Sequence, residues 1–232
     1  MRKVKCNPII GILLTSLMFL WGQTPIHADS TSPHLAAYYD LKMLICGQTA
    51  YQWKGNGLPQ LAAHNVVQVG VGRDASYALT KSGQLLTWQG SPKNKKVILD
   101  NITWFVAGRT GVFAARENDE LLYIARSQRL FKEGEATKPI QISSSVLTAS
   151  IGDSANYYVT KKGTLFVKGL AHRGQYGDGK LTSTEKYISV VNKVIAIKAH
   201  TGHAILLKQD GSVMGTGGNI FGPLGRHGVG DK

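Results

Sequence analysis

The feature that most constrains the fold is a pair of short apolar strands separated by a glycine turn. In Val194–Gly225 an apolar run over 205–207 is broken by Gln209-Asp210-Gly211, and a second strand follows the break. A glycine at such a break adopts positive φ without steric cost, as a tight hairpin requires. The stretch is therefore predicted to close a β-hairpin by its local chemistry.

Earlier stretches repeat this pattern, with equivalent positions about 35 to about 48 residues apart. The repeats and their turns are Val67–Gly90 with Gly83, Thr148–Gly169 with Gly163, and Thr103–Ala125 with Asn118-Asp119. A fainter copy over 41–55 aligns through Trp53 with Trp88. Repeats of this length are typical of propellers and arrays, in which each small sheet needs neighbours to bury its faces.

Two further motifs extend the repeat. Gly174-Gln175-Tyr176-Gly177 and Gly222-Pro223-Leu224-Gly225 each follow a glycine-turned hairpin. In the middle of one unit stands Tyr77-Ala78-Leu79-Thr80, ahead of Gly83 and Trp88, and His203 begins the apolar run of another. Together these residues resemble the regulator of chromosome condensation repeat, a β-propeller family. Departures occur at the histidine position, where three other units have Ala75, Gly111 and Ala155.

The resemblance implies an all-β propeller of about five short units, near residues 34–65, 66–101, 102–145, 146–193 and 194–232. It covers 66 to the C-terminus well and 33–63 weakly. Five such units either close into a small propeller or form an open arc of a larger one. An open arc would expose an unpaired strand edge and apolar surface, and we favour the arc.

Residues 1–28 have the pattern of a secretory signal peptide. Arg2, Lys3 and Lys5 precede an apolar stretch over 9–21, and Ile26-His27-Ala28 offers a cleavage site. Residues 29–33 form a polar spacer. No later stretch is long and apolar enough to span a bilayer. The protein is therefore expected to be secreted or associated with the cell envelope, and Cys46 would be the one cysteine left after cleavage.

The charge of the chain bears on its partners. Loss of the three leader cations lowers the formal net charge from +13 to +10. A secreted domain this basic is attracted to anionic polymers or surfaces, unless the lysines serve only solubility. Lys93, Lys95 and Lys96 cluster between two units and are the candidate contacts with such a polymer. Nucleic acid is disfavoured, because no basic run interleaves with stacking aromatic residues.

The sequence carries no recognisable catalytic constellation. His200 and His203 have no cysteine or carboxylate beside them to complete a metal site, so His203 is interpreted as a structural hydrogen-bonding residue. Gly215-Thr216-Gly217-Gly218 lacks the lysine and helix of a phosphate loop. No cofactor, metal ion or enzymatic activity is predicted, and Gly83, Gly163, Gly211, Gly174, Gly177, Gly222 and Gly225 are assigned to turns.

The function expected from these observations is non-catalytic binding of a protein partner through propeller loops. Attachment to an anionic cell-wall polymer is the alternative. Inhibition of an enzyme and guanine-nucleotide exchange are the remaining readings implied by the resemblance. No insertion stands out as the wedge with which the family's exchange factor approaches its GTPase.

Overall fold

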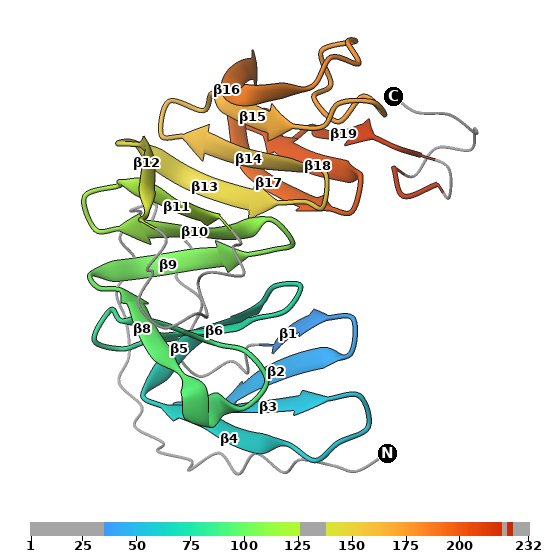
Figure 1. The fold of residues 1–232 in the computed structure, drawn as a ribbon. Coiled ribbons are helices and arrows are strands. Elements are labelled where there is room, and N and C mark those ends of the chain that lie inside the picture. Colours follow the sequence, from blue (N-terminus) through green and yellow to red (C-terminus); the bar gives the residue numbers. More distant parts are fainter. Residues whose placement is uncertain (1–34, 126–137, 220–221, 225–232) are drawn as a thin grey trace, which may run out of the picture.

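The computed structural model describes residues 35–125, 138–219 and 222–224. These residues form five antiparallel sheets that follow one another in chain order (Figure 1). Sheet 1 contains β1 (Leu35–Tyr38), β2 (Leu41–Cys46), β3 (Thr49–Lys54) and β4 (Gln60–His64). Sheet 2 contains β5 (Val66–Val71), β6 (Ser76–Thr80), β7 (Leu85–Trp88) and β8 (Lys96–Leu99), with a 3-10 turn, η1 (Pro92–Asn94), before β8.

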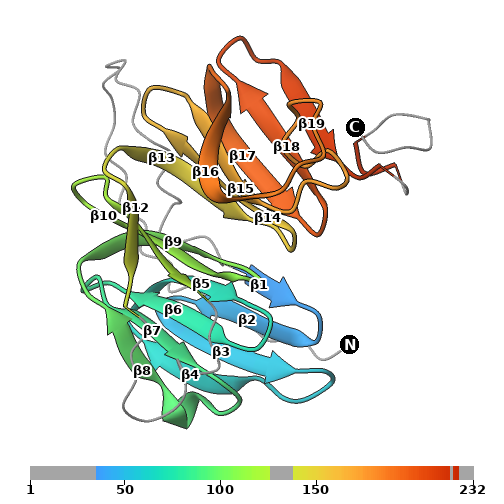
Figure 2. The ribbon, with the colours of Figure 1, turned by 45° about the horizontal axis from the view of Figure 1, so that its top comes forward.

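The remaining sheets repeat this order. Sheet 3 contains β9 (Ile102–Ala107), β10 (Gly111–Arg116), β11 (Leu121–Ala125) and β12 (Ile140–Ser143). Sheet 4 contains β13 (Val146–Ile151), β14 (Ala155–Thr160), β15 (Leu165–Gly169) and β16 (Thr184–Val191). Sheet 5 contains three described strands, β17 (Val194–His200), β18 (His203–Lys208) and β19 (Val213–Gly217). Figures 1 and 2 show the five sheets stacked as the blades of an open arc.

Consecutive sheets pack face to face, so an internal sheet contacts the preceding sheet with one face and the following sheet with the other. We call the face that meets the preceding sheet the backward face, and the face that meets the following sheet the forward face. In sheet 2 the cross-strand row Val69–Ala78–Leu86 lies on the backward face and is buried against Met43 of sheet 1. Because side chains alternate along a strand, Leu79 lies on the forward face and packs against sheet 3.

The core consequently consists of separate apolar layers between consecutive sheets rather than one centre. Between sheets 4 and 5, Tyr157, Val159 and Leu165 of the forward face are buried with Ile197 and Leu206 of the next backward face. Central strands such as β6, β10 and β14 are buried on both faces, which explains their nearly continuous apolar sequences.

In sheets 2, 3 and 4 the turn between the second and third strand also bonds to the first strand of the following sheet. Gly83 has φ 80°, and its carbonyl accepts a hydrogen bond from the amide of Ile102 at 2.9 Å. Gly163 has φ 80° and accepts from Val194 at 2.9 Å. In sheet 3 Asp119, with φ 64°, takes the glycine's place and accepts from Val146 at 3.0 Å. These turns position the first strand of the next sheet.

The expected fold class is confirmed: the described chain is all-β, with about five units in an open arc. The leader over 1–28 and the spacer over 29–33 lie outside the described residues and stay predictions. Within the described ranges no helix is long and apolar enough to cross a membrane. Cys46 is disulfide-bonded in the full chain. The expectation that Cys46 is the one cysteine left concerns the chain after cleavage and stays a prediction.

Candidate interaction surface

The strand order places two sets of loops at one edge of the arc. The turns after the first strand of each sheet and the loops after the third strand share that edge, on the right in Figure 1. We call this edge the long-loop face, because the loop over 170–183 belongs to it. The opposite edge, the short-turn face, carries the turns at Gly83, Asp119, Gly163 and Gly211.

Charge is distributed unequally between the two edges. The cationic residues in the described loops of the long-loop face are Arg73, Lys93, Lys95, Arg109, Lys138, Arg173 and Lys180, and the acidic residues are Asp40, Asp74, Asp153 and Asp178. The loops of the short-turn face contain Lys81, Lys161, Lys162 and Lys193 together with Asp100, Glu117, Asp119, Glu120 and Asp210. Among the described loops, those of the long-loop face are therefore the more basic.

Three sheets meet through one carboxylate on this face. The Tyr38 hydroxyl, at the end of β1, donates a hydrogen bond to Asp153 Oδ1 at 3.0 Å. Arg109, from the turn after β9, lies 3.8 Å from Asp153 Oδ2. The Asp153 side chain is 14% exposed, whereas that of Arg109 is 44% exposed. Asp153 thus joins sheets 1, 3 and 4, and Arg109 keeps half of its surface available to a partner.

The environment of Tyr38 favours its protonated form. Partial burial, followed by the hydrogen bond and negative charge of Asp153, raises the pKa of Tyr38 to about 12. The phenol is therefore a hydrogen-bond donor throughout the physiological range. Its role is to fix the position of β1 relative to the turn that contains Asp153.

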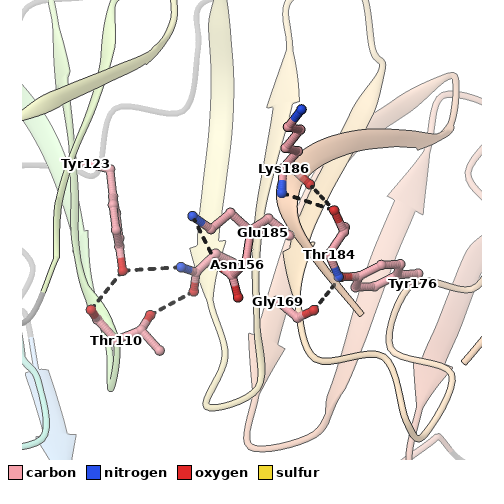
Figure 3. A network of polar contacts seen from close by, with 9 residues as sticks. Thr110, Tyr123, Asn156, Gly169, Tyr176, Thr184, Glu185 and Lys186 are labelled. Carbon is pink, nitrogen blue, oxygen red and sulfur yellow. Dashed lines mark hydrogen bonds and ion pairs between the residues drawn. The ribbon is translucent and has the colours of Figure 1, made fainter. Parts of the chain in front are cut away.

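A polar network lies between sheets 3 and 4, beneath the long-loop face (Figure 3). The Thr110 hydroxyl donates to Asn156 Oδ1 at 2.9 Å, and the Tyr123 hydroxyl donates to the Thr110 carbonyl at 2.8 Å. Asn156 Nδ2 completes the ring to Tyr123 Oη at 3.4 Å. The ring is buried or half-buried, so it holds the turn after β9 in one conformation. Sequence reasoning missed it, because its members lie far apart in the chain.

The loop over 170–183 is fixed by its own tyrosine. Tyr176 Oη donates to the Gly169 carbonyl at 2.5 Å and accepts from the Thr184 amide at 3.0 Å (Figure 3). Gly174 and Gly177 have φ of 72° and 70°. The Gly174 carbonyl accepts from the Thr216 hydroxyl of sheet 5 at 2.6 Å. This motif therefore joins two sheets as well as forming a turn.

The three candidate lysines lie within η1 or directly after it, on the same face. Ser91 accepts from the Lys93 amide at the start of this turn, and the described structure places Lys93, Lys95 and Lys96 among exposed residues. Lys95 Nζ contacts the Pro92 carbonyl at 3.5 Å. The cluster is a solvated basic projection at one side of the long-loop face.

His203 begins β18 and pairs with His200 across the turn between β17 and β18. Their ring centroids are 6.4 Å apart, and partial burial together with His200 lowers the pKa of His203. No group of three or more potential metal ligands occurs in the described ranges. Gly211 has φ 82° in the last short turn, Gly222 has φ 71° after sheet 5, and Gly225 lies outside the described residues.

The architecture defines a β-propeller arc, and solved structures identify its type. Yeast RCC1 (Prp20), in a crystal structure with Kap60, has a TM-score of 0.68 and 17% identity over 85% of this chain and 58% of its own. Human WBSCR16 has a TM-score of 0.65 and 16% identity over 83% of this chain and 62% of its own. The fold is therefore an RCC1-type β-propeller, as the sequence resemblance implied.

The chain thus spans about 60% of the length of these solved proteins. The ectodomain of the receptor kinase CR4 from Physcomitrella patens shares the architecture less closely, with a TM-score of 0.54 and 13% identity over 79% of this chain and 49% of its own. The sequence matches no protein-family model and no curated protein. At these identities the likeness establishes the fold alone.

Proposed function

We propose that this protein is a secreted, non-catalytic module that binds a protein partner through the long-loop face. The observation that carries the proposal is a buried and half-buried polar framework beneath that face. It consists of Asp153 with Tyr38 and of the ring of Thr110, Tyr123 and Asn156. Such a framework holds exposed loop residues in fixed positions, which lowers the entropic cost of binding.

Similar folds support this kind of function. Yeast RCC1 has been solved bound to Kap60, and the same yeast protein has been studied for its binding to Gsp1p and histones. Basic residues at the rim of a rigid face, here Arg73, Arg109 and Arg173, steer association with an acidic protein. The proposal takes only the class of function from these relatives.

Site-specific photocrosslinking tests the proposal. A photoreactive amino acid is placed at Arg73, Lys93 or Arg173 on the long-loop face, and separately at Ser82 or Lys162 on the short-turn face. All five positions are exposed. Protein crosslinks from the producing cells are expected from the first set alone. Crosslinks of equal yield from both sets, or from neither, would contradict recognition through the long-loop face.

The exposed cluster of Lys93, Lys95 and Lys96 favours a second candidate, attachment to an anionic wall polymer. This mode predicts binding to purified teichoic acid that weakens steeply with added salt, because exposed charges are screened. A triple substitution to glutamine at these positions should abolish it, whereas Lys161→Gln with Lys162→Gln on the short-turn face should not. Salt-resistant binding, or equal loss in both variants, would exclude the lysine cluster as the contact.

A further inference from the structure

Among the described residues, each of the two end sheets has one face on which no other sheet packs. These two faces correspond to the two sides of an internal sheet-to-sheet interface. Sheet 5 is packed on sheet 4 through its backward face. On its forward face Ile205 and Val213 are exposed, although the Leu224 side chain lies against Gly215 on the same face. Sheet 1 is packed on sheet 2 through its forward face, and no described sheet packs on its backward face, where Leu35 and Leu61 are exposed. One chain therefore carries both halves of a sheet-to-sheet interface.

The forward face of sheet 5 has the residues of a buried face. Strand pairing aligns β18 with β14, so Ile205 stands where sheet 4 has Tyr157, and Val213 stands where it has Leu165. In sheet 4 these two positions are 2% and 1% exposed. In sheet 5 they are 40% and 66% exposed, yet both remain branched and apolar. Both side chains would be buried if a further sheet packed on this face, as Tyr157 and Leu165 are buried by sheet 5.

The turn at Gly211 in sheet 5 also lacks the contact that the equivalent turns make with a following sheet. Gly211 is equivalent to Gly163 and has nearly the same backbone, with φ 82° against 80°. A Cβ on Gly163 would meet the Val194 carbonyl of the next sheet at 3.3 Å, whereas a Cβ on Gly211 would have no atom of the described residues within 4 Å. The turn that elsewhere receives the next first strand is therefore open here.

Sheet 1 presents the complementary surface. The row Leu35–Leu44–Tyr51–Leu61 crosses all four strands of its backward face. The equivalent row of sheet 2, Val69–Ala78–Leu86, is buried against sheet 1. Leu35 is 74% exposed and Leu61 is 52% exposed. This apolar row is therefore equivalent to the rows that are buried on the backward faces of the internal sheets.

We propose that the forward face of sheet 5 binds the backward face of sheet 1 in a second copy of this chain. The contact would repeat the stacking seen between sheets 4 and 5. Sheet 1 of the second copy has the strand spacing and the apolar row that such stacking requires. Lys198 beside Ile205 and Lys42 beside Trp53 lie on the two faces. Their aliphatic stems cover apolar surface while their charged ends reach solvent. Such a head-to-tail contact is heterologous, so copies add in one direction.

Light scattering of purified protein over a range of concentrations tests the proposal. The wild-type mass should rise with concentration. Val213→Asp on sheet 5 and Leu35→Asp on sheet 1 should each weaken association by about tenfold or more, because each buries a charge in an apolar contact. Leu181→Asp is the matched control, since Leu181 is 63% exposed in the loop over 170–183. Circular dichroism confirms that each variant is folded.

Mixing the two variants gives the decisive result. Val213→Asp retains an intact sheet 1 and Leu35→Asp retains an intact sheet 5, so an equimolar mixture should form dimers and no larger species. A mixture that stays monomeric while the wild type associates would overturn the head-to-tail contact. A wild type that stays monomeric at every concentration would also overturn it, and would assign these faces to another polypeptide. Equal weakening by Leu181→Asp would show that charge, rather than these faces, controls association.

Discussion

The Tyr38 hydroxyl and the Asp153 carboxylate, 115 residues apart in the chain, form a 3.0 Å hydrogen bond that links the first sheet to the fourth. Neighbouring sheets are joined by extended apolar layers, whereas this contact crosses from one part of the arc to another. Arg109 lies on the other carboxylate oxygen at 3.8 Å. The bond therefore constrains the curvature of the arc.

Loss of this bond should destabilise the protein without disturbing any sheet. We expect Tyr38→Phe to lower the free energy of unfolding by about 1 kcal/mol, because a hydrogen bond to a charged acceptor is lost and Asp153 is left less well paired. Tyr39→Phe is the control, since Tyr39 is 83% exposed. Urea unfolding followed by tryptophan fluorescence gives both values. An equal effect of the two substitutions would show that the bond contributes nothing.

The pH dependence of stability follows from the same tyrosine. The pKa of Tyr38 is raised from 10.0 to about 12, mainly by burial and then by Asp153. A raised pKa in the folded state stabilises fully below the unfolded pKa of 10.0, and this contribution is lost as the pH rises towards 12. Burial raises the pKa of Tyr77 to about 12 as well. Unfolding free energies measured between pH 9 and 12 should fall, and less steeply in Tyr38→Phe.

Equivalent turn glycines should differ in their tolerance of alanine. Gly163→Ala and Gly211→Ala both place a Cβ at positive φ, which costs about 1–2 kcal/mol. Gly163→Ala should cost more, because its Cβ also meets the Val194 carbonyl at 3.3 Å. Thermal unfolding of the two variants at low protein concentration measures the difference. Equal losses would show that the next sheet does not press on the turn at Gly163.

A buried glutamine holds sheets 1 and 2 together. Gln52 Oε1 accepts from the Ser76 hydroxyl at 2.6 Å and from Trp88 Nε1 at 2.5 Å, while Gln52 Nε2 donates to the Gly90 carbonyl at 2.8 Å. Gln52→Ala should lower the free energy of unfolding by about 3 kcal/mol, because buried donors lose their acceptor. Gln84→Ala, at a less buried side chain bonded to Asp100, is the control and should cost below about 1 kcal/mol. A small effect at Gln52 would contradict this account of the interface.

Removal of the leader should change the state of Cys46. The chain has two cysteines, and Cys46 is disulfide-bonded in the unprocessed chain. Cleavage after Ala28 before this bond forms would remove Cys6, so the secreted form should begin at Asp29 and its Cys46 should react with a maleimide. N-terminal sequencing and intact mass before and after labelling measure both. A secreted protein that retains Cys6 and does not react would contradict cleavage at this position.

Most of the fold could be predicted from the sequence repeat. Glycine at the short turns, Asp119 as their substitute and the alternating apolar strands all report local conformation, so they predict hairpins without knowledge of the tertiary structure. Trp53 marks the limit of that reasoning. It aligns with Trp88, which is 1% exposed, but it remains half-buried because no described sheet precedes sheet 1.

The candidate surface was much less visible in the sequence. Lys93, Lys95 and Lys96 are adjacent, so their clustering can be read directly. The contact between Tyr38 and Asp153 and the ring of Thr110, Tyr123 and Asn156 form only when separate sheets stack. Pairings between residues this distant depend on the curvature of the arc, which a single sequence does not specify.

Amide hydrogen exchange of dilute protein tests the open arc most directly, because β18 and β19 of sheet 5 are equivalent to β14 and β15 of sheet 4. Both pairs are hydrogen-bonded within their sheets, but described sheets pack on both faces of sheet 4 and on only one face of sheet 5. Protection follows the free energy of local opening, which falls with loss of packing. Faster exchange in β18 and β19 than in β14 and β15 is the expected result. Equal protection of the two pairs would mean that the last sheet is covered in the isolated chain, and would contradict the open arc.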